Sequence, residues 1–471
     1  MARFTTLIII SIYYWAFGTA YAQNPVLQSS RNLISIRDGK VYQSDYWQVD
    51  PKIKQDVYET YVKTGETKKI SFISDTDSLE FNVGPGQTVR FSILLNGKDT
   101  AQTLIVAQTE IPSANFDVNY IALNNDKISI EIPKVSELMN LVLAITPLVS
   151  KENGLIYKGT NYYQTILARL PKNTRSKIID IADSLISLNR RAYFNLKMDA
   201  YSYQFDQTGK IVPTKTYDRT GWERTNTLRP YIHHLQNFAD SIRFLDLYDA
   251  NQHYYDSLIH NYSEYIDIAQ IKTWLTSRLP GIAFNSYKII LSPLTGYAQS
   301  VNWLESDTFK EIHAHVNFPF REIGDSTSSH LTYKKLRSAT TVFTELNHAF
   351  INPISEKGLY ALKIKKAFNN VPAWVDMSKP GARSMDPASC FNEYMNWALV
   401  SLWYLDNAPA ADFSPLVNSV EKKMAERGFK KFNSFNQFLI ELYRHRPPQA
   451  PITELYPQII DWCLANSAEN R

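Results

Sequence analysis

The chain has 471 residues, 44% of them hydrophobic and 20% charged, so it can bury at least one large core and form two or three domains. Its net charge of +4 is small for this length, which argues against nucleic acid as a partner. The densest lysine group is interpreted as the solvated surface of a helix; it consists of Lys357, Lys363, Lys365 and Lys366. Two cysteines, Cys390 and Cys463, are too few for a disulfide framework, and one bridge between them is left open.

The first 22 residues have the features of a cleavable secretory signal. Arg3 gives a positive start, and the apolar stretch from Leu7 to Phe17 is too short to span a bilayer. Ala20-Tyr21-Ala22 then offers small residues before the expected cleavage at Gln23. No later apolar run reaches membrane length. We therefore predict an exported protein, periplasmic or extracellular, without a membrane span in the mature chain.

Residues 23–110 are predicted to form a small antiparallel β module. Alternating or apolar runs at 68–74, 78–83 and 88–95 are separated by Gly84-Pro85-Gly86 and followed by Asn96-Gly97. Asn-Gly is a strong hairpin signal because both residues tolerate positive φ, so residues 90–95 should pair with residues 102–107. The segment FISDTDSLEFNVGPGQTVRFSILLNGKD resembles a β module found at the front of exported proteins of Gram-negative bacteria. That resemblance implies an accessory role.

Residues 111–471 are predicted to form a large, mainly helical domain with a small sheet, which gives the whole chain an α+β fold. The sequence pattern predicts strands at 119–122, 127–132, 282–291 and 310–318, and helices at 136–145, 173–188, 228–247 and 254–279. Beyond about residue 335 the pattern is almost wholly helical.

The chain is rich in aromatic residues, with 29 Tyr and 9 Trp. Exported proteins that bind sugars or peptides use such rings as flat platforms, but core packing consumes most aromatic residues in any fold. The composition alone leaves both interpretations open.

One predicted helix carries a carboxylate and an imidazole one turn apart. Phe343, Leu346 and Phe350 form its buried stripe, whereas Glu345 and His348 share another face with Thr344. Pro353 is expected to end this helix. Spacing of the type E-x-x-H is weak by itself, since it arises often by chance.

A second predicted helix begins at Asp386-Pro387, a good N-cap followed by proline at the first helical position, and carries Glu393. Glu393 follows His348 by 45 residues, enough for a return helix to bring both side chains together. Its apolar surroundings indicate a partly buried carboxylate, which requires a partner.

The pair FTELNHAFINP and FNEYMNWAL resembles the helix pair of gluzincin-type zinc metallopeptidases. More closely, it resembles a secreted bacterial family of unknown function with H-E-F-x-H-x-x-x-N-P and a downstream helical Glu. The resemblance implies that Glu345 is the general base and that His348 and Glu393 are zinc ligands. It also implies supporting roles for Thr344, Asn352, Asn392 and Asn396, and a strand beside the metal helix.

The chain departs from that family at the first zinc ligand, where Thr344 replaces histidine. A neutral hydroxyl is a poor zinc donor, so zinc is a candidate cofactor with an incomplete ligand set. His313 or His315 could supply the missing donor because H-x-H in a strand places both rings on one face. The alternative is that both histidines simply face solvent.

Two classes of function follow from these residues. One is a gluzincin-derived protein that has lost zinc and binds a peptide or a glycan, and the other is a metal-dependent hydrolase with an altered ligand set. The absence of the first zinc ligand favours the binding protein. The sequence contains no G-x-S-x-G motif and no phosphate-binding glycine-rich loop.

Overall fold

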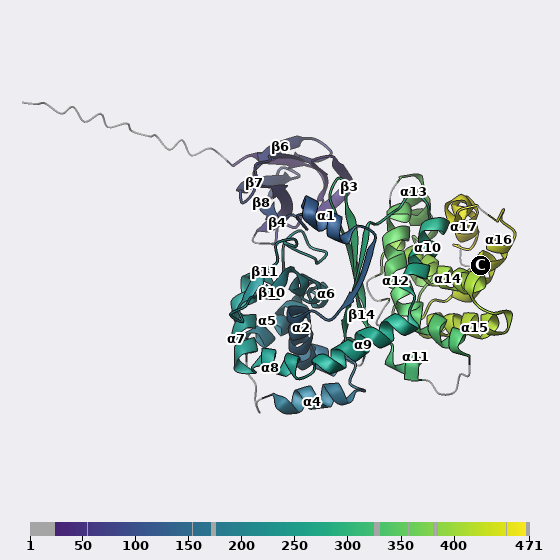
Figure 1. Cartoon of the computed structure of the whole chain (residues 1–471). Coiled ribbons are helices and arrows are strands. Elements are labelled where there is room, and N and C mark those ends of the chain that lie inside the picture. Colours follow the sequence, from purple (N-terminus) through teal and green to yellow (C-terminus); the bar gives the residue numbers. More distant parts are fainter. Residues whose placement is uncertain are drawn as a thin grey trace, which may run out of the picture. The chain divides into compact units, whose positions relative to one another are not determined.

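The computed structural model describes an α+β protein, 49% helical and 23% strand. The residues that it describes are 24–53, 55–152, 154–170, 176–324, 330–356, 358–379, 382, 385–448 and 450–467. The chain divides into two compact units, residues 1–110 (unit 1) and residues 111–471 (unit 2) (Figure 1). The predicted signal segment, residues 1–22, lies outside the described residues. No helix in the described ranges combines the length and the hydropathy needed to cross a bilayer.

Unit 1 contains two four-stranded sheets. One has the order β1 (Val26–Ser29), β7 (Thr88–Leu95), β8 (Asp99–Glu110), β4 (Asp56–Lys63), and the other the order β3 (Val41–Gln48), β2 (Leu33–Asp38), β5 (Lys68–Ile73), β6 (Ser78–Val83). Neighbouring strands are antiparallel, except that β1 runs parallel to β7 and β4 parallel to β8. The core includes Phe72 and Phe91, whose ring centroids lie 4.7 Å apart.

The predicted hairpin of unit 1 is confirmed. Asn96 and Gly97 have φ values of 50° and 66°, as the tight turn requires. The register differs from the prediction by three residues, because Leu95 pairs with Asp99 and Arg90 with Leu104, so residues 90–95 face residues 99–104 rather than 102–107.

Unit 2 is built around a four-stranded sheet with the order β13 (Ser300–Glu305), β14 (Lys310–Asn317), β12 (Ser286–Ser292), β9 (Lys127–Glu131). Strands β9, β12 and β14 are parallel, whereas β13 is an antiparallel edge strand that the sequence pattern did not predict. One face of the sheet carries the apolar residues Ile289, Ile312 and Ala314, all fully buried. The other face carries buried polar residues, including His313 and His315.

Helices lie on both sides of this sheet (Figure 1). The first group comprises α1 (Val118–Asn124), α2 (Lys134–Ile145), α3 (Pro147–Lys151), α4 (Asn161–Arg169), α5 (Lys177–Leu188), α6 (Arg191–Asp199), α7 (Ile232–Ser241) and α8 (Phe244–Asp249). Helix α9 (Gln252–Tyr265) follows this group, and α10 (Ile268–Arg278) lies on the opposite side of the sheet, with the helices of the second group (Figure 1). The second comprises α11 (Phe320–Gly324), α12 (Leu331–Glu356), α13 (Gly358–Ala367), α14 (Pro387–Asn407), α15 (Ala410–Glu426), α16 (Phe432–Arg444) and α17 (Tyr456–Ala465). A short hairpin, β10 (Tyr203–Phe205) and β11 (Ile211–Pro213), completes the unit.

Two expectations for the first part of unit 2 were wrong in detail. Residues 119–122 form helix α1 rather than a strand, because the Asp117 side chain accepts a hydrogen bond from the backbone N–H of Tyr120 (2.8 Å) and caps the helix. The helix expected over 228–247 is divided at Arg243, whose φ of +52° lies outside the helical region.

Two further helix expectations also need correction. The helix predicted over 254–279 is divided before Asp267, which caps the start of α10 through the N–H of Gln270 (2.8 Å). Pro353 does not end α12, which continues to Glu356. A proline at this position removes one backbone hydrogen bond, the one that the Ala349 carbonyl would accept, and this loss is small in a helix that ends three residues later.

Candidate functional site

Helices α12 and α14 pack against each other along their apolar stripes. Phe343 and Trp403 stack at 4.9 Å between them, and Leu346 and Phe350 are fully buried. Asp386 caps α14 by accepting hydrogen bonds from the N–H groups of Ala388 (2.9 Å) and Ser389 (3.1 Å), as the sequence predicted. This packing fixes the polar faces of both helices relative to each other.

The helix pair brings His348 and Glu393 together. Nε2 of His348 lies 3.4 Å from Oε1 of Glu393, and each side chain is 19% exposed. Two zinc donors at about 2.1 Å in a tetrahedral site stand roughly 3.4 Å apart, so the pair has the separation that a shared ion imposes. The predicted proximity of these two residues is therefore present in the structure.

Arg427, which sequence reasoning missed, occupies the other side of Glu393. Its Nη2 atom lies 2.7 Å from Oε2 of Glu393, and its guanidinium lies over the rings of Trp397 (5.4 Å) and Phe429 (5.1 Å). Burial alone would raise the pKa of Glu393, but Arg427 and His348 outweigh it and hold that pKa far below its ordinary value. Glu393 is thus an ionised carboxylate with an internal cation.

Asparagines orient the imidazole of His348. Nδ2 of Asn347 donates to Oδ1 of Asn396 (2.9 Å), so the amide group of Asn396 faces Nε2 of His348 at 2.9 Å. Nδ1 of His348 lies 3.3 Å from Oδ1 of Asn352. This arrangement suits a neutral imidazole that accepts at Nε2 and donates from Nδ1.

Glu393 favours the opposite charge state of His348. Burial lowers the pKa of His348, yet the neighbouring carboxylate outweighs burial and raises that pKa above its ordinary value. Asn396 and Glu393 therefore compete over the proton at Nε2. Two neighbours thus favour opposite protonation states of one imidazole, which suits a group that gives up and takes back a proton.

Glu345 lies one helical turn before His348 on the same face of α12. Burial raises the pKa of Glu345 to about 7, and the negative charge of Glu393 adds to the effect, while the cationic neighbours His348, Lys197 and Arg427 oppose it. Near neutral pH this half-buried carboxyl group can both donate and accept a proton.

Thr344 and Asn392 do not join the charged cluster. The Thr344 side chain is buried, and its hydroxyl donates to the backbone carbonyl of Thr341 at 2.8 Å, so it is turned toward its own helix. Asn392 accepts a hydrogen bond from the Ser355 hydroxyl and donates to Glu356 at 3.2 Å. Asn392 thus ties α14 to the end of α12.

His313 and His315 lie on β14, and both rings are buried rather than facing solvent. Nε2 of His313 lies 2.8 Å from Oε1 of Glu311, which also accepts a hydrogen bond from the Tyr217 hydroxyl at 2.6 Å. Burial, helped by Lys197 and His313, lowers the pKa of His315 well below its ordinary value. Within the described ranges neither ring makes a hydrogen bond or ion pair with His348 or Glu393.

These donors do not make up a zinc site with three protein ligands. Among the residues that the structure describes, no three His, Cys, Asp or Glu side chains gather within reach of one metal ion. His348 and Glu393 have a suitable separation, but Asn396 contacts Nε2 and Arg427 contacts the second carboxylate oxygen. The residues present therefore fit an internally satisfied polar cluster better than a resident zinc ion.

A buried lysine near this cluster was also not predicted from the sequence. Nζ of Lys197 on α6 donates to the carbonyl of Ala298 (2.9 Å) and lies 5.5 Å from the ring centre of Tyr193. Burial lowers the pKa of Lys197 to about 7, while the charge of Glu345 opposes the shift. The apolar neighbours of Lys197 in the sequence, Phe194 and Leu196, were the available signal for its burial.

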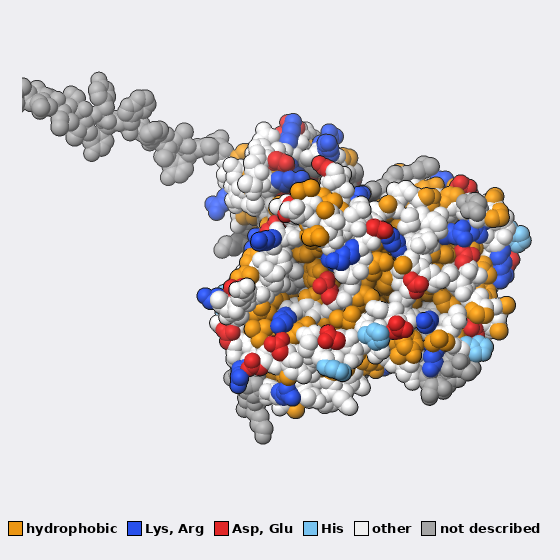
Figure 2. Space-filling view, in the orientation of Figure 1, with side chains coloured by type: hydrophobic (Ala, Val, Ile, Leu, Met, Phe, Trp, Pro, Cys, Tyr) orange, Lys and Arg blue, Asp and Glu red, His pale blue; other side chains and the backbone are white. Residues whose placement is uncertain are grey.

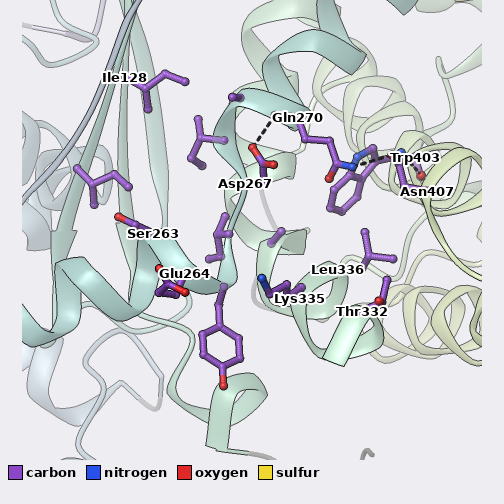
Figure 3. Close-up of a pocket in the computed structure, with 16 residues that line it drawn as sticks. Ile128, Ser263, Glu264, Asp267, Gln270, Thr332, Lys335, Leu336, Trp403 and Asn407 are labelled. Atoms are coloured by element: carbon purple, nitrogen blue, oxygen red, sulfur yellow. Dashed lines mark hydrogen bonds between the residues drawn. The ribbon is translucent and has the colours of Figure 1, made fainter. Parts of the chain in front are cut away.

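A pocket of about 410 Å³ lies at the other end of the helix pair (Figure 3). It is bounded by Ile128 and Ile130 of β9, the junction of α9 and α10, the first turns of α12, and Trp403 and Asn407 of α14. Apolar side chains gather on the surface between the sheet and α10 (Figure 2). The lining includes none of the predicted site residues and no histidine or cysteine. The pocket is therefore separate from the predicted site.

Comparison with known proteins identifies a family. No curated protein and no solved structure matches the chain. A model described as a domain of unknown function (DUF4932) matches residues 191–461, which include α12, α14 and Arg427. Because this match covers more than half of the sequence, the chain belongs to the DUF4932 family.

Proposed function

We propose that this is an exported, gluzincin-like protein that binds a peptide or a glycan at the cluster of Glu345, His348, Glu393 and Arg427 without zinc. The observation that carries the proposal is the position of Arg427, whose guanidinium lies 2.7 Å from the carboxylate expected to bind a metal. A cation supplied by the protein neutralises Glu393, so a metal ion is not needed to stabilise its charge.

The chemistry of the cluster suits recognition of a polar ligand. Arg427 is 32% exposed at its side chain and supplies directed donors, whereas the half-buried Glu345 and His348 supply groups that can donate or accept. The rings of Trp397 and Phe429 contact the guanidinium and restrict its movement. The Arg427 side chain therefore loses little conformational entropy when a ligand binds. The site thus offers a ligand both ionised and neutral hydrogen-bonding groups in a partly desolvated environment.

A metal-dependent hydrolase with an altered ligand set is the second candidate. It is favoured by the separation of 3.4 Å between His348 and Glu393 and by the raised pKa of Glu345, about 7. It requires a third donor that the described residues do not bring to this pair.

Binding of the purified full chain to an immobilised peptide array and to a glycan array tests the proposal. We expect binding to one array, at least tenfold weaker in Arg427→Met because a charge-assisted hydrogen bond contributes about 1.5–3 kcal/mol. The matched control is Arg444→Met, which removes an arginine at the end of α16 paired with Glu441 at 2.6 Å.

The same peptides, incubated with the protein with and without added zinc, separate the two candidates. Mass spectrometry should find the peptides intact in both cases. Cleavage that depends on zinc and disappears in Glu345→Gln would replace the proposal with the hydrolase. Binding that is unchanged in Arg427→Met would exclude this cluster as the ligand site.

A further inference from the structure

Strand β3 of unit 1 exposes two tyrosines, Tyr42 (51% exposed) and Tyr46 (58% exposed). Gln43 pairs with the buried Ile36, and the ring of Trp47 packs in the core against Phe72 at 5.4 Å. Since neighbouring side chains of a strand point to opposite faces, Tyr42 and Tyr46 both point away from the core. Between Tyr42 and Tyr46 a β-bulge interrupts the pairing of β3 with β2, at the point where β2 runs from Ile34 to Ile36.

The rings of Tyr42 and Tyr46 are exposed, whereas the other aromatic rings of unit 1 for which contacts are described pack against one another. Trp47, Tyr58, Phe72, Phe81 and Phe91 contact one another inside unit 1 at centroid distances of 4.7 to 6.3 Å. Leaving two large rings in water forgoes the stabilisation that burial of an aromatic side chain provides. Two such rings on one strand face make that face a candidate binding surface.

The register of the sheet places a row of polar side chains beside Tyr42. Tyr42 pairs with Arg37, Arg37 with Ser71, and Ser71 with Glu80, so the row crosses β3, β2, β5 and β6. We call this row, together with Tyr46 and Lys69, the tyrosine face. The Arg37 guanidinium lies 5.5 Å from the ring centre of Tyr42.

Charges on the tyrosine face are largely satisfied within it. Lys69 pairs with Glu80 at 2.8 Å, and the Ser71 hydroxyl donates to the same carboxylate at 3.2 Å. Next to Tyr46, Asp45 pairs with Arg31 at 2.8 Å. The face thus presents flat rings and fixed hydrogen-bonding groups without a strong field of one sign, which complements a neutral, polyhydroxylated ligand.

We propose that the tyrosine face binds a neutral polysaccharide, with Tyr42 and Tyr46 stacking on the apolar faces of its sugar rings. Four residues along a strand span about 13 Å, somewhat less across a bulge, so the two rings engage separate sugar units of one chain. The sugar hydroxyls then bond to the tyrosine hydroxyls and to the ordered polar groups of Arg37 and Glu80. This site is independent of the cluster proposed in unit 2.

The experiment is a pull-down of the full chain on insoluble cellulose, chitin and β-1,3-glucan at high salt. We expect binding to at least one of the three, about tenfold weaker in Tyr42→Ala and in Tyr46→Ala, and lost in the double variant, because a stacked ring contributes about 1 kcal/mol or more. Tyr42→Trp should retain binding, since it keeps a flat ring.

Tyr297→Ala is the matched control, because it removes an equally exposed tyrosine (59%) from unit 2. It should bind like the unmodified protein, and the surface variant Arg444→Met should too. The exposed positions of Tyr42 and Tyr46 predict unchanged thermal unfolding of the alanine variants, and this is measured alongside. Binding to none of the three polysaccharides, or binding that survives in the double variant, would overturn the proposal. So would dimerisation through β3 that the double variant abolishes.

Discussion

The carboxylate of Glu393 lies between two cationic or ionisable groups, 3.4 Å from Nε2 of His348 on one side and 2.7 Å from Nη2 of Arg427 on the other. Each contact uses a different carboxylate oxygen, so both can be kept at once. The charge of Glu393 therefore stabilises the proton of His348 while Arg427 stabilises the charge of Glu393. This coupling makes the ionisation of the histidine depend on the carboxylate.

Glu393→Gln should lower the pKa of His348, because burial opposes protonation once the carboxylate is gone. The measurement is an NMR titration of the imidazole nitrogen signals. Glu441→Gln, which removes a surface carboxylate paired with Arg444, serves as the control and should leave the His348 titration in place. An unchanged midpoint in Glu393→Gln would contradict the coupling between these two groups.

Thr344→His should create a zinc site in a protein that holds no stoichiometric zinc as isolated. The new imidazole would project one turn before His348, and with Glu393 it would complete three protein donors. Metal content after dialysis, measured by mass spectrometry, checks both statements. Thr344→Ala removes the hydroxyl without adding a donor and should stay free of zinc. One zinc per chain in the unmodified protein would sink this prediction.

Glu137→Gln should change how stability depends on pH. Burial raises the pKa of Glu137 from 4.5 to about 7, although hydrogen bonds from Ser292 and Tyr162 oppose the shift. Between these pH values the folded protein keeps the proton that the unfolded chain has lost, so the free energy of unfolding falls as pH rises. The upper bound of this loss is roughly 3 kcal/mol.

The glutamine variant lacks the titration but keeps an oxygen that can accept from the Tyr162 hydroxyl, now 2.7 Å from the carboxyl group. Relative to the unmodified protein it should therefore gain stability between pH 5 and pH 7. Denaturant unfolding at several pH values measures the difference. Glu264→Gln, at an exposed position, is the control. A difference between the proteins that does not vary with pH would count against the buried carboxyl group as its source.

Cys390 and Cys463 should resist thiol reagents in the folded protein. Both are free and buried, and burial raises the pKa of each thiol far above its ordinary value, which keeps the reactive thiolate scarce. We expect slow reaction with a thiol reagent under native conditions and two thiols per chain after unfolding without a reductant. Finding no thiol after unfolding would instead reveal a disulfide.

Local signals predicted the parts of the structure that depend on few residues. The Asn96-Gly97 turn and the Asp386-Pro387 start of α14 are encoded by backbone preferences of the residues themselves, and both were correctly predicted. Short apolar runs were less reliable, because residues 119–122 suit a strand until the Asp117 cap is considered. The break at Arg243 had no such signal, since arginine rarely adopts positive φ.

Only the part of the candidate site that lies on helices α12 and α14 could be predicted from the sequence. Helical spacing placed Glu345, His348 and Glu393 on facing surfaces, but Arg427 comes from the end of α15, whose position depends on tertiary packing. The burial of His313 and His315 likewise follows from the helices that cover the sheet. A sequence pattern cannot distinguish a solvated strand face from one that is covered in this way.

The order of strands in the unit 2 sheet has a consequence for folding. Lys127 of β9 lies beside Ser286 of β12, although 159 residues separate them in the chain, whereas β12 and β14 are joined by a short connection through β13. Closing so long a loop costs roughly 4–5 kcal/mol of chain entropy, which must be offset by contacts that form at the same time. Strand β9 should therefore join the sheet late in refolding, after β12, β13 and β14 have assembled.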